Sequence, residues 1–455
     1  MTTNLVAASR MVAAVAIAAF ALPVFSATGP EGTWTGQWER DGSTLDVEMS
    51  FSRDASGYTG TFSSAQLRVV GIPLTNVKYE APRVTWQIAG DETTSSFEGS
   101  LRDDTMSGTF REGTASGTFT LVRGVSGGAQ VQESDISFSN GAVTLSGTLV
   151  SPAGSGPFAG VVFLHGSGAE GRWASRYLAH EVAKRRIAGL IYDKRGVGHS
   201  GGDWRTAGFA DLVGDATAAV EALRAQRNID ADRVGIHGHS QGATIAPWIA
   251  SAAPGIAFVA ASAAGGVPMA EMETYSLENS LDVSDMAPEE KALAERFVHA
   301  IVATAYEGAP RADLDRVADE ARGHAWAFDP PPASDHYWSF SRSIAGYDPL
   351  DYWRRVTVPV LLLYGEADER VPPRLSARRI ANAYLAAKGP RLDVMFFPLA
   401  DHNYRWSSET GGRFAWPRTV PDYPERLIDW VVEASKPCAC HMDEAGLNTT
   451  NSRSQ

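Results

Sequence analysis

A serine flanked by glycines is the segment of this chain best suited to chemistry. Residues 238–242 read Gly-His-Ser-Gln-Gly, after an apolar run and before a helix-like stretch at residues 243–253. A strand that turns sharply into a helix through Gly-x-Ser-x-Gly exposes the serine hydroxyl at a helix N-terminus, where free N–H groups favour developing negative charge. Ser240 is the predicted nucleophile, and the backbone N–H of Gln241 is a predicted oxyanion donor. The alternative is a glycine-rich turn with an incidental serine.

A serine nucleophile needs a base to take its proton and an acid to orient that base. Two later loops, each directly after an apolar run, supply them. Asp368 is the predicted acid and His402 the predicted base. Glu366 and Asp401 are alternatives for the acid. Glu366 follows its apolar run immediately, whereas Asp401 adjoins the histidine, and neighbouring side chains usually point apart.

A turn of small residues, His-Gly-Ser-Gly at residues 165–168, follows another apolar run. Its backbone can approach a substrate carbonyl closely, because glycine carries no side chain. The backbone N–H of Ser167 or Gly168 is therefore the predicted second oxyanion donor. His165 is expected to hold this turn in place and not to transfer protons.

These motifs, with serine, acid and histidine in that order, resemble the α/β-hydrolase superfamily over residues 132–435. A further segment at residues 193–200, Asp-Lys-Arg-Gly-Val-Gly-His-Ser, is similar to a glycine loop common in that family, although by itself it reads as a solvated turn. Within the superfamily the chain looks like secreted esterases grouped with dienelactone-hydrolase and acylaminoacyl-peptidase relatives.

The resemblance implies a secreted carboxylesterase that acts on a small-molecule ester through a triad of Ser240, His402 and Asp368, with no cofactor and no metal. A peptidase or an acyltransferase of the same fold is the alternative, because the triad does not choose the leaving group or the acceptor. A non-catalytic ligand-binding protein is the alternative from another class.

Apolar runs alternate with helix-like stretches over residues 130–435, which predicts an α/β domain with a parallel sheet. The predicted strands are residues 142–150, 160–164, 188–192, 233–236, 257–261, 358–364 and 392–397. The predicted helices are residues 177–186, 209–226, 243–253, 374–387 and 423–434.

The alternation stops between residues 266 and 356, where a helical cap insertion is predicted. Aromatic residues of the cap and two tryptophans outside it are candidates for an acyl pocket, although ordinary packing explains them equally well. They are Tyr275, Trp326, Tyr337, Trp338, Phe340, Tyr347, Trp173 and Trp204. The substrate contacts predicted from this set are Trp173, Trp326 and Trp338, together with His239 beside the nucleophile. His239 and its neighbour His237 are otherwise expected to pack.

Residues 29–124 show a different pattern, with short alternating runs separated by Gly, Asp and Ser. Alternation with a period of two and such frequent turns predicts antiparallel strands. A recurring Gly-Thr-aromatic unit favours a small lipocalin-like meander barrel, which we interpret as an accessory domain. A glycine-rich linker at residues 124–128 separates it from the α/β domain.

The ends and the composition set the remaining expectations. Arg10 precedes an apolar stretch at residues 11–22, shorter than the roughly 20 residues that span a bilayer, so residues 1–27 are predicted to be a cleaved signal peptide. A periplasmic or secreted protein without stable membrane insertion follows, and an uncleaved anchor is the alternative.

The tail at residues 436–455, with Cys438 and Cys440, is predicted to be disordered and not to bind metal. The net charge of −13 argues against nucleic acid as a partner.

Overall fold

The computed structural model describes residues 29–89, 93–124, 131–281, 286–406, 419–420 and 422–437. The predicted signal peptide, the linker after Gly124, and Cys438 and Cys440 in the predicted tail lie outside these residues. Among the helices of the described ranges, none has the length and apolar character needed to cross a membrane.

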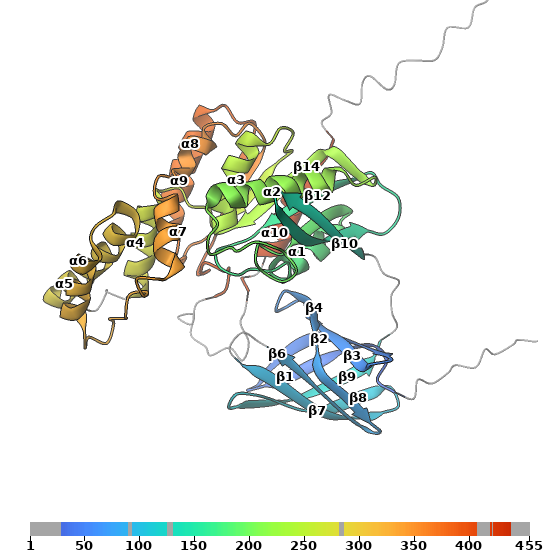
Figure 1. Cartoon of the computed structure of the whole chain (residues 1–455). Helices are drawn as coiled ribbons and strands as arrows, with labels where there is room; N and C mark the ends of the chain where they lie inside the picture. Colours follow the sequence, from blue (N-terminus) through green and yellow to red (C-terminus); the bar gives the residue numbers. More distant parts are fainter. Residues whose placement is uncertain are drawn as a thin grey trace, which may run out of the picture.

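The N-terminal part is an antiparallel β domain, drawn in blue at the bottom of Figure 1. In the described part of the chain its nine strands form one sheet in the order β4-β3-β2-β1-β9-β8-β7-β6-β5. They are β1 Gly32–Arg40, β2 Ser43–Asp54, β3 Gly57–Ser64, β4 Val69–Pro73, β5 Thr75–Glu80, β6 Arg83–Ala89, β7 Thr94–Arg102, β8 Thr105–Glu112 and β9 Ala115–Arg123. Leu74 alone joins β4 to β5, and β5 contacts β3 as well as pairing with β6, so the two edges meet and the barrel is nearly closed.

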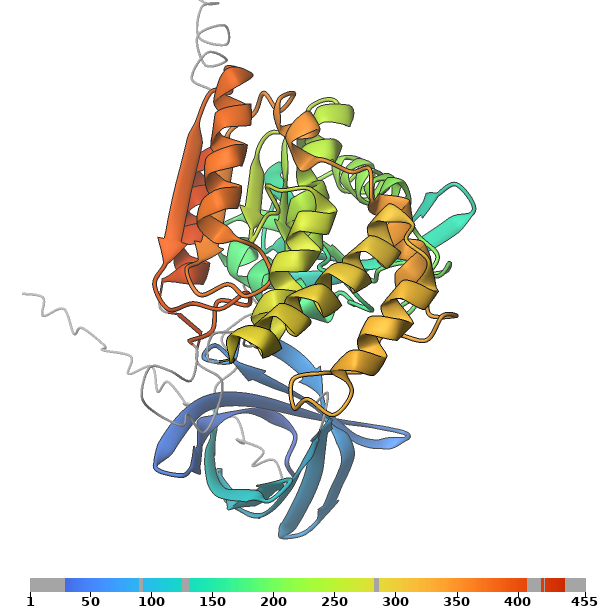
Figure 2. The same ribbon diagram turned by 90° about the vertical axis from the view of Figure 1, so that its left-hand side faces the viewer.

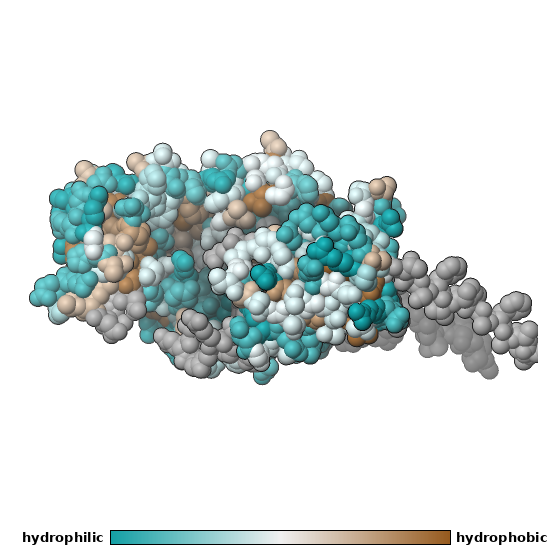
Figure 3. All heavy atoms as spheres, turned by 90° about the horizontal axis from the view of Figure 1, so that it is seen from below, coloured by the Kyte–Doolittle hydropathy of each residue, from teal (hydrophilic) through white to brown (hydrophobic). Residues whose placement is uncertain are grey.

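Aromatic side chains fill the inside of this barrel because alternate residues of each strand point inward. Trp38 stacks on Phe62 with ring centroids 4.7 Å apart, and Trp86 stacks on Phe97 at 5.1 Å. All four side chains are buried. The outer faces of the strands are polar, and the view from below in Figure 3 shows a mostly hydrophilic or neutral surface with small separate hydrophobic areas.

The second part is the predicted α/β domain, built on a sheet in the order β10-β11-β13-β12-β14-β15-β16-β17. The strands are β10 Val131–Asn140, β11 Val143–Pro152, β12 Phe158–Leu164, β13 Ile187–Tyr192, β14 Ile229–His239, β15 Val259–Ser262, β16 Val360–Gly365 and β17 Leu392–Phe397. The pairs β10–β11 and β11–β13 are antiparallel and the others are parallel, so the sheet is mixed where the sequence predicted a parallel one.

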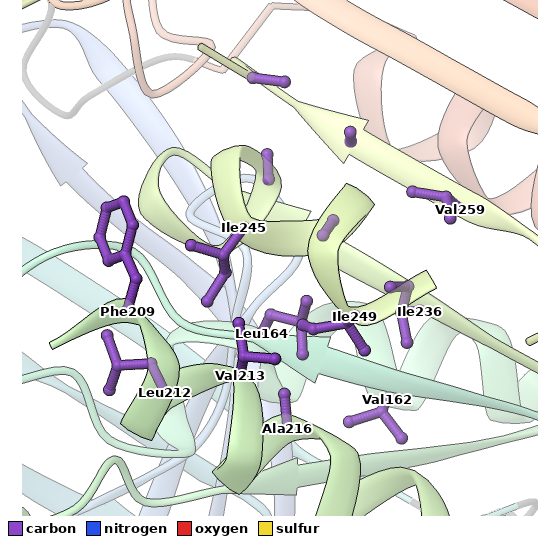
Figure 4. Close-up of a cluster of buried hydrophobic side chains, with 14 of the residues drawn as sticks. Val162, Leu164, Phe209, Leu212, Val213, Ala216, Ile236, Ile245, Ile249 and Val259 are labelled. Carbon is purple, nitrogen blue, oxygen red and sulfur yellow. The ribbon is translucent and has the colours of Figure 1, made fainter. Parts of the chain in front are cut away.

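Helices cover both faces of this sheet, which is why its central strands are apolar without a break. They are α1 Trp173–Lys184, α2 Phe209–Arg224, α3 Gln241–Ala252, α9 Pro373–Ala386 and α10 Tyr423–Ala434. Val162 and Leu164 of β12 pack with Ile245 of α3 in one core, as Figure 4 shows, whereas Val161 packs in another core with Leu427 of α10. Both cores hold the carboxyl ends of the strands in place.

A helical insertion separates β15 from β16, and Figures 1 and 2 show it to one side of the sheet in yellow and orange. It consists of α4 Met269–Ser280, α5 Pro288–Val302, the π-helical turn η2 Ala303–Glu307, α6 Arg311–Ala321, α7 His336–Ile344 and α8 Pro349–Trp353. Phe297 and Ile301 of α5 pack with Leu314 and Val317 of α6 in a small core of its own.

The β domain touches the α/β domain through Arg68, in the turn before β4. Its guanidinium lies over the ring of Tyr423 at 4.7 Å from the centroid, and its Nη2 donates to the carbonyl of Val420 at 3.4 Å. Burial lowers the pKa of Arg68. Tyr423 in turn stacks on Tyr404, with ring centroids 3.7 Å apart. This contact therefore reaches the loop that carries His402.

Candidate active site

Ser240 lies in the sharp turn between β14 and α3. Its backbone has φ 53° and ψ −114°, which non-glycine residues rarely adopt. The flanking glycines are required by space: a Cβ on Gly238 would overlap the backbone of Gly242, and a Cβ on Gly242 would lie 2.7 Å from the carbonyl oxygen of His165. The turn places the Ser240 hydroxyl at the N-terminus of α3, where the first N–H groups have no partner within the helix.

The structure brings together the three residues predicted to act as a triad. The Oγ of Ser240 lies 2.8 Å from Nε2 of His402, and Nδ1 of His402 lies 2.9 Å from each carboxylate oxygen of Asp368. The Asp368 carboxylate also accepts the backbone N–H groups of Arg370 at 2.8 Å and Val371 at 2.9 Å, which fix its orientation. Asp368 and His402 are buried. The imidazole therefore lies between a hydroxyl and a buried, oriented carboxylate.

The two alternative acids point elsewhere. Glu366 forms an ion pair with Arg374. Asp401 accepts the backbone N–H groups of Asn403 at 2.9 Å and Arg405 at 2.7 Å, so it caps its own turn. Neither carboxylate contacts the imidazole.

A second serine–histidine pair lies in the interior. The Oγ of Ser262, at the end of β15, is 3.0 Å from Nε2 of His237 and 3.0 Å from the hydroxyl of Tyr423. Ser262 is 0% exposed, and burial, with His239 nearby, lowers the pKa of His237 to about 3. This pair has the atoms of a nucleophile and its base, but its burial keeps it from substrate. Its hydrogen bonds connect β14, β15 and α10, so its role is structural.

The turn at residues 165–168 lies beside Ser240, and both Ser167 and Gly168 border the same cavity as Gln241. The N–H of Gly166 is already taken, since it donates to Oε2 of Glu170 at 2.6 Å. Burial, with Lys194 nearby, lowers the pKa of His165 to about 4, and the neutral ring donates through Nε2 to the carbonyl of Tyr192 at 2.5 Å. His165 thus holds the turn, as its position in the sequence predicts.

A cavity of about 620 Å³ opens over Ser240 and His402, between the sheet and the helical insertion. Its wall is mixed, with apolar and aromatic side chains beside about as many polar and charged ones. The lining residues beyond the triad and the oxyanion turn include Trp204, Phe209, Leu212, Met269, Met272, Glu273, Tyr306, His336, Tyr337, Phe340, Ile344 and Arg370. Trp204, Tyr337 and Phe340 are among the aromatic candidates predicted from the sequence, whereas the methionines and Tyr306 have no sequence signal.

The four predicted substrate contacts do not line this cavity. Trp173 is 44% exposed on a separate polar cleft. His239 donates through Nε2 to the backbone carbonyl of His402 at 2.9 Å. Trp326 donates to Glu290 at 3.0 Å and Trp338 donates to the carbonyl of Pro332 at 2.9 Å, so both anchor the insertion. None of the four is among the residues that border the cavity over Ser240, and their role as substrate contacts stays a prediction.

The run Asp193-Lys194-Arg195 is also not the solvated turn that it resembles in isolation. All three side chains are buried. Asp193 pairs with Arg172 at 2.8 Å, and Arg195 donates two hydrogen bonds of 2.7 Å to Asp215. Buried charges need such partners, because an unpaired one would lose its hydration without compensation. No group of three His, Cys, Asp or Glu side chains in the described ranges is arranged to hold a metal ion.

The fold and the motifs place this chain in a known family. The family model described as "Serine aminopeptidase, S33" matches residues 155–392, more than half of the chain, and the chain belongs to this family of the α/β-hydrolase superfamily. Among curated proteins, Esterase EstD of Thermotoga maritima is 28% identical over 251 residues, which is 53% of this chain and 53% of that protein. The chain thus spans about half the length of this relative.

The solved structures to which this chain is similar include an esterase of Pyrococcus furiosus and a proline iminopeptidase of Mycobacterium smegmatis. The first is 18% identical with a TM-score of 0.40 and covers 67% of this chain and 90% of its own. The second is 16% identical with a TM-score of 0.43 and covers 66% of this chain and 99% of its own.

Proposed function

We propose that this protein is a serine carboxylesterase that hydrolyses small to medium carboxylic esters through an acyl-enzyme. The observation that carries the proposal is the continuous series of contacts from Asp368 through His402 to Ser240, which ends at a cavity of about 620 Å³. Cavities of roughly 300–1,000 Å³ suit small molecules. The relative named as an esterase supports ester hydrolysis as the reaction.

The proposed reaction has two steps. As Oγ of Ser240 attacks the ester carbonyl, its proton passes to Nε2 of His402, while Asp368 holds the Nδ1–H of the same ring. The N–H groups of Gln241 and of the Ser167–Gly168 turn stabilise the oxyanion. His402 gives its proton to the departing alcohol. Water, activated by the same imidazole, then attacks the acyl-enzyme and releases the acid.

The most direct test is labelling with a fluorophosphonate, followed by a screen of p-nitrophenyl esters and aminoacyl amides. Labelling with ester turnover supports the esterase. Labelling without ester turnover would favour a peptidase or an acyltransferase, and a complete lack of labelling would favour the ligand-binding alternative.

The aromatic wall of the cavity is expected to set acyl preference. Phe340 of α7 borders the cavity, so Phe340→Ala should raise kcat/KM for p-nitrophenyl octanoate over that for the acetate by about tenfold, because a few methylenes in an apolar pocket discriminate by about that much. Trp338→Ala on the same helix is the matched control, because Trp338 bonds to the Pro332 carbonyl outside the cavity. An unchanged ratio in Phe340→Ala, or an equal shift in both variants, would exclude this acyl site.

One observation favours an aminopeptidase as the second candidate. Glu273 of α4 borders the cavity, accepts the Tyr337 hydroxyl at 2.8 Å, and has its pKa raised by burial. A substrate ammonium beside it would favour the ionised carboxylate, and the family description names an aminopeptidase.

For that candidate, Glu273→Gln is expected to lower kcat/KM for an aminoacyl p-nitroanilide by about 10- to 100-fold, as the loss of a charged hydrogen bond does, and to spare acetate-ester turnover. The steady-state comparison of the two substrates decides between the candidates. A wild-type enzyme that cleaves esters but no aminoacyl amide would reject the aminopeptidase.

We also propose that the protein is exported to the periplasm or beyond, because Arg10 precedes the apolar residues 11–22 as in a signal peptide. N-terminal sequencing of the protein recovered from its native cell envelope tests this. A mature chain that begins near residue 28 is expected, and one that retains Met1 would reject cleavage.

A further inference from the structure

Lys194, which follows β13, is a buried lysine that the proposed mechanism does not use. Its side chain is 3% exposed and lies directly beneath the oxyanion turn. Nζ donates to the carbonyl of Gly166 at 2.6 Å, to the carbonyl of Gly168 at 3.0 Å and to Oε1 of Gln241 at 3.0 Å. An ammonium has three N–H groups. Each therefore has an acceptor within the protein, and none is left to bond to a substrate.

The three acceptors belong to the two segments that carry the proposed oxyanion donors. The carbonyl of Gly166 and the N–H of Ser167 belong to one planar trans peptide, so they point in opposite directions. Lys194 holds the carbonyl, which fixes the direction of the Ser167 N–H at the cavity. The preceding peptide is fixed as well, because Glu170 accepts the N–H of Gly166 at 2.6 Å. The third bond ties this turn to Gln241, the first residue of α3.

We infer that Lys194 is a positioning residue that aligns the oxyanion donors, by holding the turn at residues 166–168 against Gln241. The inference rests on the serine hydrolase mechanism proposed above. Oxyanion donors accelerate a reaction only when they are oriented before the charge develops, and small misalignments are costly. Lys194 also borders the cavity, but its three N–H groups are bonded within the protein, so it acts on the transition state through the backbone and not through a bond to substrate.

The protonation of Lys194 should therefore be visible in the pH dependence. Burial lowers the pKa of Lys194 to about 8, an effect that Glu170 opposes. The other titratable groups that face it are His165, which is partly buried, Tyr192, which is buried, and Asp215, which is paired with Arg195. A neutral amine has two N–H groups for three acceptors. The turn thus loses a bond, and kcat should fall as pH rises through about 8.

The first test compares Lys194→Met with Lys184→Met, a control that removes a half-exposed lysine paired with Glu181 on α1. In Lys194→Met, kcat for p-nitrophenyl acetate should fall about 10- to 100-fold, KM should change less than about threefold, and the alkaline decline should disappear. The control should match the wild type. An unchanged kcat, a loss confined to KM, or a retained alkaline decline would overturn the inference.

The second test acts on an acceptor and stands even if Lys194→Met does not fold. Gln241→Leu removes one oxygen that stabilises the ammonium, so the alkaline decline should move to lower pH, because a hydrogen bond to the charged form raises a pKa. A decline at the wild-type position overturns the inference. If the wild type neither labels with fluorophosphonate nor turns over an ester, the proposed function fails as well. Normal wild-type turnover with an unaffected Lys194→Met overturns this inference alone.

Discussion

Replacement of Ser240 by alanine is expected to abolish ester turnover, with kcat reduced by about 10⁶-fold, the scale seen when a triad serine is removed. Its Oγ is the atom within 2.8 Å of His402 at the mouth of the cavity, so no other group takes its place. The folded state should persist, because alanine keeps the Cβ and removes a single oxygen. Steady-state hydrolysis, fluorophosphonate labelling and the melting temperature measure the three consequences.

The control for this variant is Ser262→Ala, which removes the hydroxyl of the buried serine–histidine pair. Its folded fraction should label at the wild-type rate, since Ser262 is sealed from solvent. Near-normal turnover in Ser240→Ala, or loss of labelling in folded Ser262→Ala, would show that the nucleophile has been misassigned.

The second large effect is expected for Asp368→Asn, which should lower kcat by about 10⁴-fold with little change in fold. One carboxylate oxygen accepts the N–H groups of Arg370 and Val371, and the asparagine carbonyl would keep those bonds. The amide NH₂ would then face Nδ1 of His402. A donor at that place favours the tautomer in which Nδ1 is the acceptor, which places the ring proton on Nε2 and removes the base from Ser240. The kcat of the purified variant on p-nitrophenyl acetate measures the effect.

Glu366→Gln and Asp401→Asn are the matched controls, because each neutralises a nearby carboxylate that does not touch the imidazole. Both should retain kcat within about threefold, as surface substitutions away from a site usually do. A larger loss in either control than in Asp368→Asn would transfer the role of the acid to that residue.

The sequence predicts the relative positions of the triad because local rules determine them. Apolar runs predict β16 and β17, and their loops deliver Asp368 and His402 to one edge of the sheet, where the elbow presents Ser240. The prediction of a strand at residues 392–397 coincides with β17, and that of a helix at residues 423–434 coincides with α10. β17 is a short apolar run and α10 has one apolar face, so each follows from its local pattern.

The first strand of the sheet shows where such rules stop. β10 (Val131–Asn140) is not among the predicted strands, because it pairs antiparallel at an edge and most of its residues face solvent. Its sequence lacks the apolar run of a central strand. β10 is antiparallel to β11 because a short turn joins the two strands. The composition of neither strand predicts this direction.

The wall of the cavity depends on contacts between elements distant in sequence. Trp326 and Trp338 looked suitable for a pocket, but each finds a hydrogen-bond acceptor inside the insertion. Met272 and Tyr306, with no distinguishing neighbours in the chain, border the same cavity as Ser240 because α4 and η2 pack against it. Lys194 likewise reads as a solvated charge until its three acceptors are known.

The backbone angles of Ser240 lower the stability of the fold at the position of the proposed nucleophile. A conformation of this kind costs about 1–3 kcal/mol, a sizeable part of the roughly 5–15 kcal/mol by which a domain is usually stable. Glycine adopts such angles without this strain, so Ser240→Gly is expected to raise the melting temperature. The same variant has no hydroxyl and is expected to show no ester turnover. The packed cores on both faces of the sheet hold Ser240 in a backbone conformation that glycine adopts more readily.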